Sequence, residues 1–375
     1  LSEIIGKGRI AGISKLIPAD TKPMVVYGGG SIKKNGDDAQ IQEALAKHTW
    51  IEFSGVESNP SIETLDKAVA LARAEKVGFI LAVGGGSVID GSKYLAAAAL
   101  YEGEGWDLVT RKSKITRALP VGAILTLPAT GSESNNNSVM TRRSTHEKYS
   151  FAAAALQPAF AVLDPDVVKT LPDGQLTNGV VDAFVHVCEQ YLTIPTDAWV
   201  QEGYAETLLK NLVKLAAQWP QRDSDCWREN LMFTANQALN GLVGTGVPQD
   251  WATHIIGHEL TALWGIDHAR TLSIIQPSLL RHQINNKRQK LEQMGRNVFA
   301  LTASADLAER TIDAIEQVYR SLNMPVRLRE AGVNDSDAVE KVIAALNEHG
   351  KRSLGENQNI SPDVSREIVA LALGA

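Results

Sequence analysis

The stretch LAVGGGS, residues 81–87, ends an apolar run in three glycines and a serine, and VVYGGGS, residues 25–31, has the same form. A glycine cluster directly after an apolar, β-branched run is typical of a buried strand followed by a tight turn, often with φ > 0. Such a turn can bring main-chain N–H groups close to an anion, because glycine has no Cβ and the following helix offers its N-terminus. The two stretches therefore predict two strand-to-helix turns in one sheet, each a candidate phosphate site.

Neither turn is the usual dinucleotide fingerprint. In the register of G-x-G-x-x-G, the third glycine is replaced by Lys33 in the first turn and by Ile89 in the second. A single glycine turn is weak evidence for phosphate binding, whereas two turns in one sheet are stronger evidence. The pair therefore favours phosphate binding but disfavours an ordinary Rossmann fingerprint.

Strand and helix signals alternate in the first part of the chain. Apolar runs of strand length are separated by helical stretches such as residues 61–76, which predicts a parallel sheet flanked by helices. The alternating polar segment 138–151 is typical of a hairpin. The expected strands lie within residues 24–29, 49–55, 79–85, 122–130 and 160–165.

The strand signals end near two prolines, Pro165 and Pro172. Beyond them, helical periodicity continues almost to the end of the chain. We therefore expect two domains, an α/β domain over residues 1–172 and an all-helical domain over residues 173–375.

Composition limits the classes of function. The chain has 375 residues, 44% of them hydrophobic, and a net charge of −6 without a basic run, so nucleic acid is not an expected partner. No apolar stretch reaches the roughly 18 residues of a membrane-spanning helix, and the N-terminus lacks the layout of a signal peptide. Cys188 and Cys226 are too few for a disulfide framework. The sequence therefore predicts a cytoplasmic protein without a nucleic-acid or membrane partner.

The helical half carries residues suited to metal binding. Asp182 and His186 are four residues apart in an apolar stretch, so both project from the same face of a largely buried helix. A buried carboxylate needs a partner or a metal. This pair alone is equally consistent with a structural Asp–His hydrogen bond and with a metal site.

Three further histidines shift that balance towards a metal. His254 and His258 are four residues apart on another expected helix, and His268 follows beyond Gly265. One carboxylate and three imidazoles suit a first-row divalent ion such as Fe²⁺ or Zn²⁺, whereas Ca²⁺ and Mg²⁺ prefer oxygen ligands. The spacing does not say which of the three histidines is not a ligand.

The sequence resembles the iron-containing, metal-dependent alcohol dehydrogenases through four motifs. These are GGGSVIDGSK at 84–93, LPATGSESN at 127–135, DAFVH at 182–186 and GHELTALWGIDHA at 257–269. The resemblance covers essentially the whole chain and is closest to the branch of NADPH-dependent aldehyde reductases and butanol dehydrogenases. It implies a Rossmann-like, dinucleotide-binding α/β domain followed by an all-helical, metal-binding catalytic domain, as in dehydroquinate synthase. It also implies a homodimer.

The resemblance assigns roles to individual residues. It implies four metal ligands, namely Asp182, His186, His254 and His268. It makes His258 and Asp90 catalytic groups that also contact the cofactor near its nicotinamide. The other cofactor contacts that it implies are Gly28, Gly29, Gly30, Ser31, Asn59, Gly85, Gly86, Ser87, Thr126, Thr130, Ser132, Asn135 and Lys148.

The first glycine turn also bears on the choice of cofactor. NAD-preferring relatives commonly have an aspartate at the position of Gly30, whose charge repels a 2′-phosphate. This chain has Gly30 and Ser31 there, and Lys33 and Lys34 follow with positive charge, so the resemblance favours NADP(H). Glu52 is expected to be a surface residue at a strand end and not a ribose ligand.

The resemblance implies hydride transfer between NADPH and the carbonyl of a small aldehyde, with the divalent ion as Lewis acid. One alternative is a lyase of the dehydroquinate synthase kind, which should offer several basic residues at the metal. The residues beside the metal motifs are instead mainly apolar, namely Phe184, Trp251, Leu263 and Trp264. A second alternative, a non-catalytic helical scaffold with structural Asp–His pairs, leaves the two glycine turns unexplained.

Overall fold

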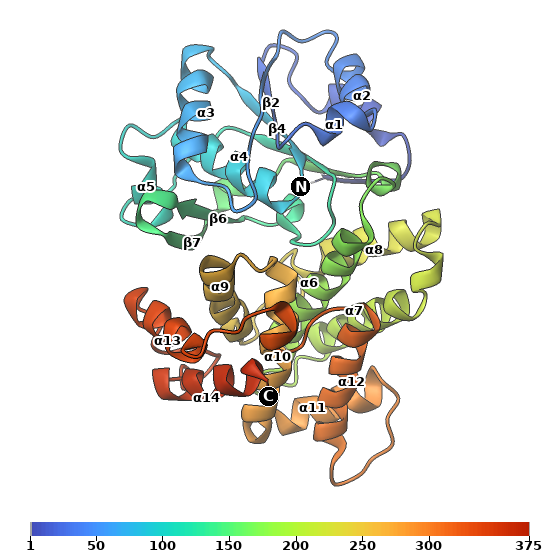
Figure 1. Cartoon of the computed structure of the whole chain (residues 1–375). Helices are drawn as coiled ribbons and strands as arrows, with labels where there is room; N and C mark the ends of the chain where they lie inside the picture. The colour runs from blue at the N-terminus through green and yellow to red at the C-terminus, as the bar shows by residue number, and fades with distance from the viewer. Residues whose placement is uncertain (1, 375) are drawn as a thin grey trace. The chain divides into compact units, whose positions relative to one another are not determined.

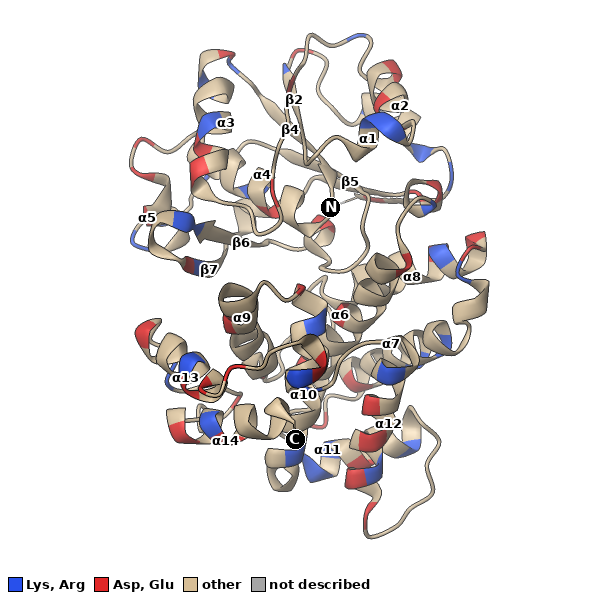
Figure 2. Ribbon diagram, in the orientation of Figure 1, with Lys and Arg blue, Asp and Glu red and all other residues tan. Residues whose placement is uncertain are grey.

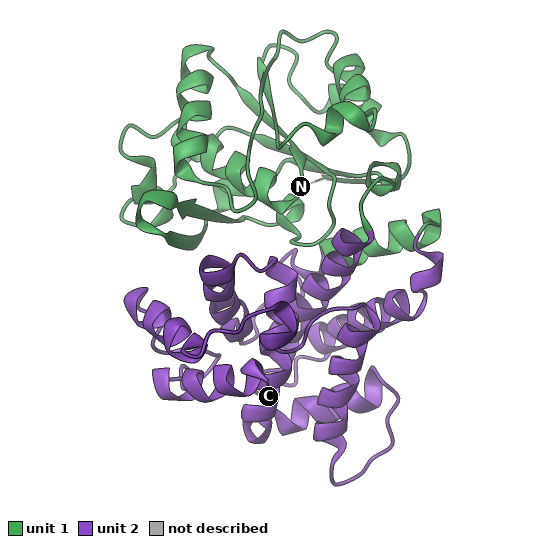
Figure 3. Ribbon diagram, in the orientation of Figure 1, with its two compact units in different colours: residues 1–172, 223–236 green, residues 173–222, 237–375 purple. Residues whose placement is uncertain are grey.

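The computed structural model describes residues 2–374. Its chain divides into two units, which Figure 3 shows in different colours. Unit 1 comprises Leu1–Pro172 and Asp223–Asn236, and unit 2 comprises Asp173–Arg222 and Gln237–Ala375. All strands lie in unit 1, within the part of the chain that the structure describes.

Unit 1 is built on a parallel sheet (Figure 1). Its strands are β1 Ser2–Ile5, β2 Pro23–Tyr27, β3 Ile51–Phe53, β4 Phe79–Gly84, β5 Val121–Leu125 and β8 Phe160–Leu163. They pair in the order β1-β8-β5-β4-β2-β3, and every pairing is parallel. The predicted parallel sheet is therefore confirmed. The sequence does not predict β1, because this edge strand is largely exposed and lacks a buried apolar run.

Both faces of the sheet are covered, which explains why its strands are almost continuously apolar. Alternate side chains of β4 enter different core clusters. Ile80 and Ala82 pack with α3 Ile62–Ala74 and α4 Gly86–Ala98, whereas Leu81 packs with α2 Asp37–Ala44 on the other face. The helix predicted over residues 61–76 is confirmed as α3.

The predicted hairpin is also confirmed. Strands β6 Asn137–Arg142 and β7 Glu147–Ala152 pair antiparallel. The hairpin packs on α4, where the Ser138 hydroxyl donates to the main-chain oxygen of Asp90 at 2.9 Å. This contact fixes the hairpin next to the helix that follows the second glycine turn.

The two glycine turns need glycine for different physical reasons. Gly30 has φ of 93° and precedes the short helix α1 Ser31–Lys34, as expected for a turn with φ > 0. The expectation is wrong for the second turn, where Gly84, Gly85 and Gly86 all lie outside the positive-φ region. There the cause is close approach, since a Cβ at Gly84 would stand 2.5 Å from the Val88 side chain. Glycine is therefore required for close packing in the second turn and for a positive φ in the first turn.

Unit 2 is helical, which confirms the predicted all-helical C-terminal region. Its helix α10 His268–His282 packs against five other helices of the unit, α6, α9, α11, α12 and α14. Helix α6 is buried along most of its length, as its apolar sequence predicts. The helices that follow Pro172 are α6 Asp173–Tyr191, α7 Trp199–Ala217, α8 Asp225–Ala238, α9 Ala252–Trp264, α10, α11 Ile284–Asn297, α12 Leu307–Ser321, α13 Ala338–Glu348 and α14 Pro362–Leu373.

Charge is mixed over the molecule. On the side drawn in Figure 2, Lys and Arg lie beside Asp and Glu on the helices of both units, in keeping with a net charge of only −6. Among residues 2–374, no helix combines the length and the apolarity that crossing a membrane requires.

Candidate functional site

Three imidazoles surround one carboxylate in unit 2. Asp182 and His186 lie one turn apart on α6, whereas His254 lies in the first turn of α9 and His268 is the first residue of α10. The Nε2 atoms of His186, His254 and His268 are 3.4, 3.7 and 3.5 Å from Asp182 Oδ1. Ligand atoms of Asp182, His254 and His268 all lie within 4.8 Å of one another. The structure thus brings together the four residues that the sequence analysis proposes as metal ligands.

The spacing of these atoms fits a metal better than it fits hydrogen bonds. Hydrogen bonds join N and O atoms at about 2.7–3.2 Å, which is shorter than the distances around Asp182. Asp182 Oδ1 and His254 Nε2 are buried and, among the described residues, have no hydrogen-bond partner. Ligand atoms that each lie about 2.0–2.2 Å from a tetrahedral ion stand about 3.3–3.6 Å apart. The residues present therefore suit one divalent ion.

The charges of the site also favour a cation. Burial opposes ionisation of Asp182, but the imidazoles of His186 and His268 outweigh burial and hold the pKa of Asp182 well below its ordinary value. Burial likewise opposes protonation of His254, but Glu189 and Asp182 raise its pKa to about 9. The site therefore keeps an ionised carboxylate and attracts positive charge, which a divalent ion supplies in place of protons.

Two further side chains, His258 and Trp251, lie beside the four proposed ligand residues. His258 lies half-buried one turn after His254, and its ring centroid is 5.5 Å from that of His268. Trp251 has φ of 65°, a backbone region that bulky side chains rarely adopt, and its ring meets that of His254 edge-on at 5.3 Å. Phe184, another apolar residue beside the metal motifs, is instead fully buried in the core. Trp251 therefore gives the imidazole cluster an apolar border.

In unit 1, the second glycine turn lies against the loop that follows β5. A Cβ at Gly86 would stand 2.5 Å from the Thr130 side chain, so only glycine permits this approach. Asp90, further along α4, accepts hydrogen bonds from the Ser132 hydroxyl and from the Val139 N–H, and burial raises the pKa of its carboxyl. The structure thus gathers four predicted cofactor contacts, and Asp90 also joins α4 to the loop and the hairpin.

The remaining predicted contacts of unit 1 occupy the same edge of the sheet or the hairpin. Strands β2 and β4 are adjacent and parallel, with Tyr27 opposite Val83, so the turns that follow them, residues 28–31 and 84–87, lie at one edge. Lys148 on β7 donates from Nζ to Asn59 Oδ1 at 2.7 Å. Thr126 follows β5, where its N–H donates to the Gly84 oxygen at 3.0 Å, and Asn135 lies in the loop before β6.

Lys33 has a partner that the sequence analysis does not foresee. Its Nζ is 3.2 Å from Glu52 Oε1 and 5.5 Å from the centroid of the Tyr27 ring. Glu52 is exposed, as expected for a residue of β3 at the surface. Exposed ion pairs contribute little to stability, so Lys33 can leave Glu52 for a more highly charged anion.

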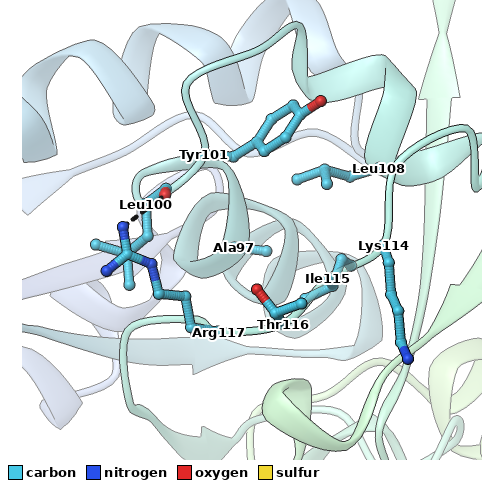
Figure 4. Close-up of a pocket in the computed structure, with 8 residues that line it drawn as sticks. All are labelled: Ala97, Leu100, Tyr101, Leu108, Lys114, Ile115, Thr116 and Arg117. Atoms are coloured by element: carbon cyan, nitrogen blue, oxygen red, sulfur yellow. Dashed lines mark hydrogen bonds between the residues drawn. The ribbon is translucent and has the colours of Figure 1, made fainter.

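A small pocket of unit 1 involves none of the predicted site residues (Figure 4). It lies between the end of α4, the short helix α5 Gly105–Val109 and the segment 114–117. Its volume of about 40 Å³ has room for a few water molecules and not for a nucleotide. The lining residues are Ala97, Leu100, Tyr101, Leu108, Lys114, Ile115, Thr116 and Arg117.

Family models match both halves of the chain. The model described as "Iron-containing alcohol dehydrogenase" matches residues 2–165, and "Fe-containing alcohol dehydrogenase family, C-terminal" matches residues 176–371. The chain belongs to the iron-containing alcohol dehydrogenase family. The resemblance that four sequence motifs indicate is therefore confirmed.

Relatives within the family are similar over nearly the full length. The chain is 46% identical to the NADPH-dependent aldehyde reductase YqhD of Escherichia coli, over 98% of this chain and 97% of the relative. It is 35% identical to the NADH-dependent butanol dehydrogenase A of Clostridium acetobutylicum, over 97% of this chain and 95% of that protein. Both relatives belong to the branch that the sequence motifs indicate.

Solved structures of the family share the fold. The substrate- and cofactor-free form of YqhD from E. coli is 44% identical and gives a TM-score of 0.93, covering 99% of this chain and 97% of that one. The NADH-dependent butanol dehydrogenase A of Thermotoga maritima gives a TM-score of 0.93 at 35% identity, covering 100% of this chain and 97% of that one. The predicted fold class is confirmed.

Sequence reasoning misses two residues that support the sites of this iron-containing alcohol dehydrogenase. Lys93 is fully buried, and its Nζ donates to Ser132 Oγ at 3.0 Å and to Asn135 Oδ1 at 3.1 Å. Burial lowers the pKa of Lys93 to about 8. Glu189, on α6, contacts His254 through its carboxylate. The sequence held a signal in both cases, because each is a charged residue within a helix that is otherwise largely apolar.

Proposed function

We propose that this iron-containing alcohol dehydrogenase transfers hydride between NADPH and the carbonyl carbon of a small aldehyde. The observation that carries the proposal is the group of three imidazole nitrogens 3.4–3.7 Å from Asp182 Oδ1, in a chain that also has the family's glycine turn. Similarity to a relative named NADPH-dependent aldehyde reductase supports it. In this proposal, residues 1–172 bind the dinucleotide and residues 173–375 bind the metal and carry out catalysis.

The ligand residues determine what the metal can do. Asp182, His186, His254 and His268 hold one divalent ion, Fe²⁺ or Zn²⁺, which supplies Lewis-acid polarisation of the carbonyl oxygen while NADPH supplies the hydride. Asp182 is the one anionic member of the set, so the four ligands neutralise only half of a divalent charge. His258 lies beside the ligands and relays the proton that the alcohol oxygen requires.

The apolar border of the ligand cluster suits a weakly polar substrate. Trp251 presents its ring to His254 at 5.3 Å and to His186 at 6.2 Å. A large aromatic ring at this place limits the size of the substrate and excludes water from one side of the ligands. A small aldehyde such as butanal fits both the limited space and the apolar surroundings.

The glycine turns and the nearby side chains bind NADP(H) in this proposal. The N-terminus of α4, where Gly85 precedes the helix, offers N–H groups to the diphosphate. At the first turn, Gly30 and Ser31 leave room beside the adenosine ribose, and Lys33 supplies positive charge to the 2′-phosphate. Asp90 lies near the nicotinamide end and is held in place by the Ser132 hydroxyl.

The direct test of the reaction is product identification. Purified protein is incubated with NADPH and butanal, and butanol is measured by gas chromatography while NADPH is followed by its absorbance. We expect one molecule of butanol for each NADPH oxidised, and a lower kcat/KM with NADH. Oxidation of NADPH without formation of the alcohol would contradict the proposal.

His258→Ala is expected to retain the metal but to reduce butanal more slowly, because we place His258 beside the ligands as a proton relay. Loss of a general acid lowers the rate by about 100-fold or more. Metal analysis and kcat measured on one preparation give both quantities. If the variant instead contains no metal, His258 is a ligand, and the roles of His254 and His258 are reversed.

The proposal also includes a homodimer, which rests on the resemblance to the family, and a cytoplasmic location, which rests on the composition and patterning of the sequence. Light scattering should give twice the chain mass of 40.5 kDa. A mass equal to one chain at micromolar concentration would contradict the dimer. Fractionation of the source cells tests the location.

A further inference from the structure

Glu189 is a buried carboxylate that the proposed reaction does not use. It lies on α6, seven residues after Asp182 and three after His186, and is only 3% exposed. Its Oε1 accepts a hydrogen bond from the Thr253 N–H at 2.8 Å, and its Oε2 contacts Nδ1 of His254. Helix α6 therefore carries two proposed ligands, Asp182 and His186, and also the carboxylate that contacts a third, His254.

The contact with His254 determines where the proton of that imidazole lies. An ionised carboxylate only accepts hydrogen bonds, so the proton of the neutral ring lies on Nδ1. The lone pair of Nε2 then points away from Glu189, and Nε2 is the atom that lies 3.7 Å from Asp182 Oδ1. Metal binding requires this tautomer, because the ligating nitrogen must be free of its proton.

The contact with Thr253 fixes the helix that carries the imidazole. Thr253 lies in the first turn of α9, where backbone N–H groups have no partner within the helix. Glu189 accepts one of them, and the main-chain oxygen of Glu189 accepts the Asp250 N–H at 2.8 Å. The Asp250 side chain in turn accepts the Ala252 N–H at 3.0 Å. One residue of α6 thus anchors both the start of α9 and the ring of His254.

A buried lysine also contacts the segment that precedes α9. Lys287 is 2% exposed, and its Nζ lies 2.8 Å from Asp250 Oδ2 and 3.2 Å from Glu356 Oε1. Among the ion pairs of residues 2–374, Glu189 has His254 as its partner and no lysine or arginine. The negative charge of Glu189 is therefore directed to the imidazole and, through it, to the metal site.

We propose that Glu189 is a positioning residue for the metal ligand His254, fixing the orientation of its ring and engaging Nδ1 so that Nε2 is the nitrogen left to bind the ion. The inference rests on the proposed metal site. It predicts that Glu189 controls metal affinity without touching the ion, because carboxylates that bond a ligand histidine make the ring a better ligand.

The test is the Glu189→Gln variant. Its amide oxygen can accept only one of the two N–H groups, and its NH₂ group then faces the other, so the His254 ring loses its acceptor or the α9 turn does. We expect the apparent Kd of the metal-free protein for Co²⁺ to rise about 10- to 100-fold, measured by competition with a chelator. The Co²⁺ absorption bands at saturation should also shift, because they report the ligand geometry.

The chain offers a matched control in Glu259→Gln. Glu259 lies on the same helix as His254, is 6% exposed, and contacts Nδ1 of another histidine, His349, at 2.8 Å. We expect its variant to keep the natural Co²⁺ affinity and spectrum. An equal loss in both variants would overturn the proposal, since it would show a general effect of removing a buried carboxylate.

Two further measurements test the role of Glu189, one on the Glu189→Asp variant and one on Co²⁺ binding by the natural chain. Glu189→Asp retains the acceptor chemistry and should bind Co²⁺ more tightly than Glu189→Gln; equal weakness would overturn the positioning role. If Glu189→Gln fails to fold, Glu189→Asp is compared with the natural chain instead, and an unchanged Co²⁺ affinity and spectrum would overturn the positioning role. Failure of the metal site itself has a different signature, because the natural chain would then bind no Co²⁺.

Discussion

The His254→Ala variant is expected to fold, to lose its bound metal and to reduce butanal about 1,000-fold more slowly than the natural chain. The variant removes one of four ligands, and metal polarisation of a carbonyl is worth several kcal/mol, where each 1.36 kcal/mol corresponds to about tenfold in rate. It also leaves Glu189 buried without the imidazole, which costs about 1–3 kcal/mol of stability. Three measurements on one preparation check this result: circular dichroism for folding, metal content for the loss of the ion, and kcat/KM for the rate.

A control for this variant is His349→Ala. His349 is a half-buried histidine of the same unit that also contacts a glutamate, Glu259, but it lies outside the proposed ligand set. Its variant should keep the metal and the rate while losing a similar amount of stability. Full metal content and a normal rate in His254→Ala would remove His254 from the ligand set.

The Gly30→Asp variant is expected to lose NADPH activity by about 100-fold or more in kcat/KM while its NADH activity holds or improves. A carboxylate beside the adenosine ribose can accept a bond from a free 2′-hydroxyl, whereas it faces a phosphate of about −1.5 to −2 charge in NADPH. Like charges at such a site cost several kcal/mol. Most of the effect should appear in the KM of the cofactor, because the ribose does not take part in hydride transfer.

The backbone at Gly30 requires a control for this variant. Its φ of 93° strains any L residue, although no heavy atom lies within 4 Å of the position that a Cβ would occupy. Gly30→Asn introduces a side chain of the same size without charge and bears a similar backbone strain. The ratio of kcat/KM for NADPH to that for NADH should change far more in Gly30→Asp than in Gly30→Asn. Equal changes in both variants would mean that glycine is present for the turn alone.

The sequence predicted the sheet well because most of its strands are buried on both faces. Runs such as residues 79–84 are apolar throughout, and their ends coincide with glycine turns. β1 escaped prediction since an exposed edge strand needs no such run. The reason for the second glycine turn also escaped, because close packing of Gly84 on Val88 depends on side-chain positions that spacing along the chain does not contain.

The candidate metal site was only partly accessible from spacing. A separation of four residues places Asp182 and His186 on one face of α6, but it could not rank His254, His258 and His268, which belong to two helices. The family resemblance supplied that ranking. The structure adds distances, with Nε2 of His254 and of His268 at 3.7 and 3.5 Å from Asp182 Oδ1.

The supporting residues were hidden for a similar reason. Glu189 follows His186 by three residues on a buried helix, a pattern visible in the sequence, yet its partner lies far along the chain at His254. Lys93 likewise bonds Ser132 and Asn135, which are distant in sequence. Charged residues inside apolar helices are thus a usable signal, but their partners come from the fold.

A titration of the natural chain with metal tests most directly whether turnover depends on the proposed ion. Protein freed of metal by a chelator is titrated with Fe²⁺ under anaerobic conditions, and in parallel with Zn²⁺, while bound metal and NADPH-dependent reduction of butanal are both measured. The expected result is no turnover without metal and a linear rise in turnover with at least one of the two ions, ending at one bound ion per chain. Full turnover in the metal-free protein would contradict it.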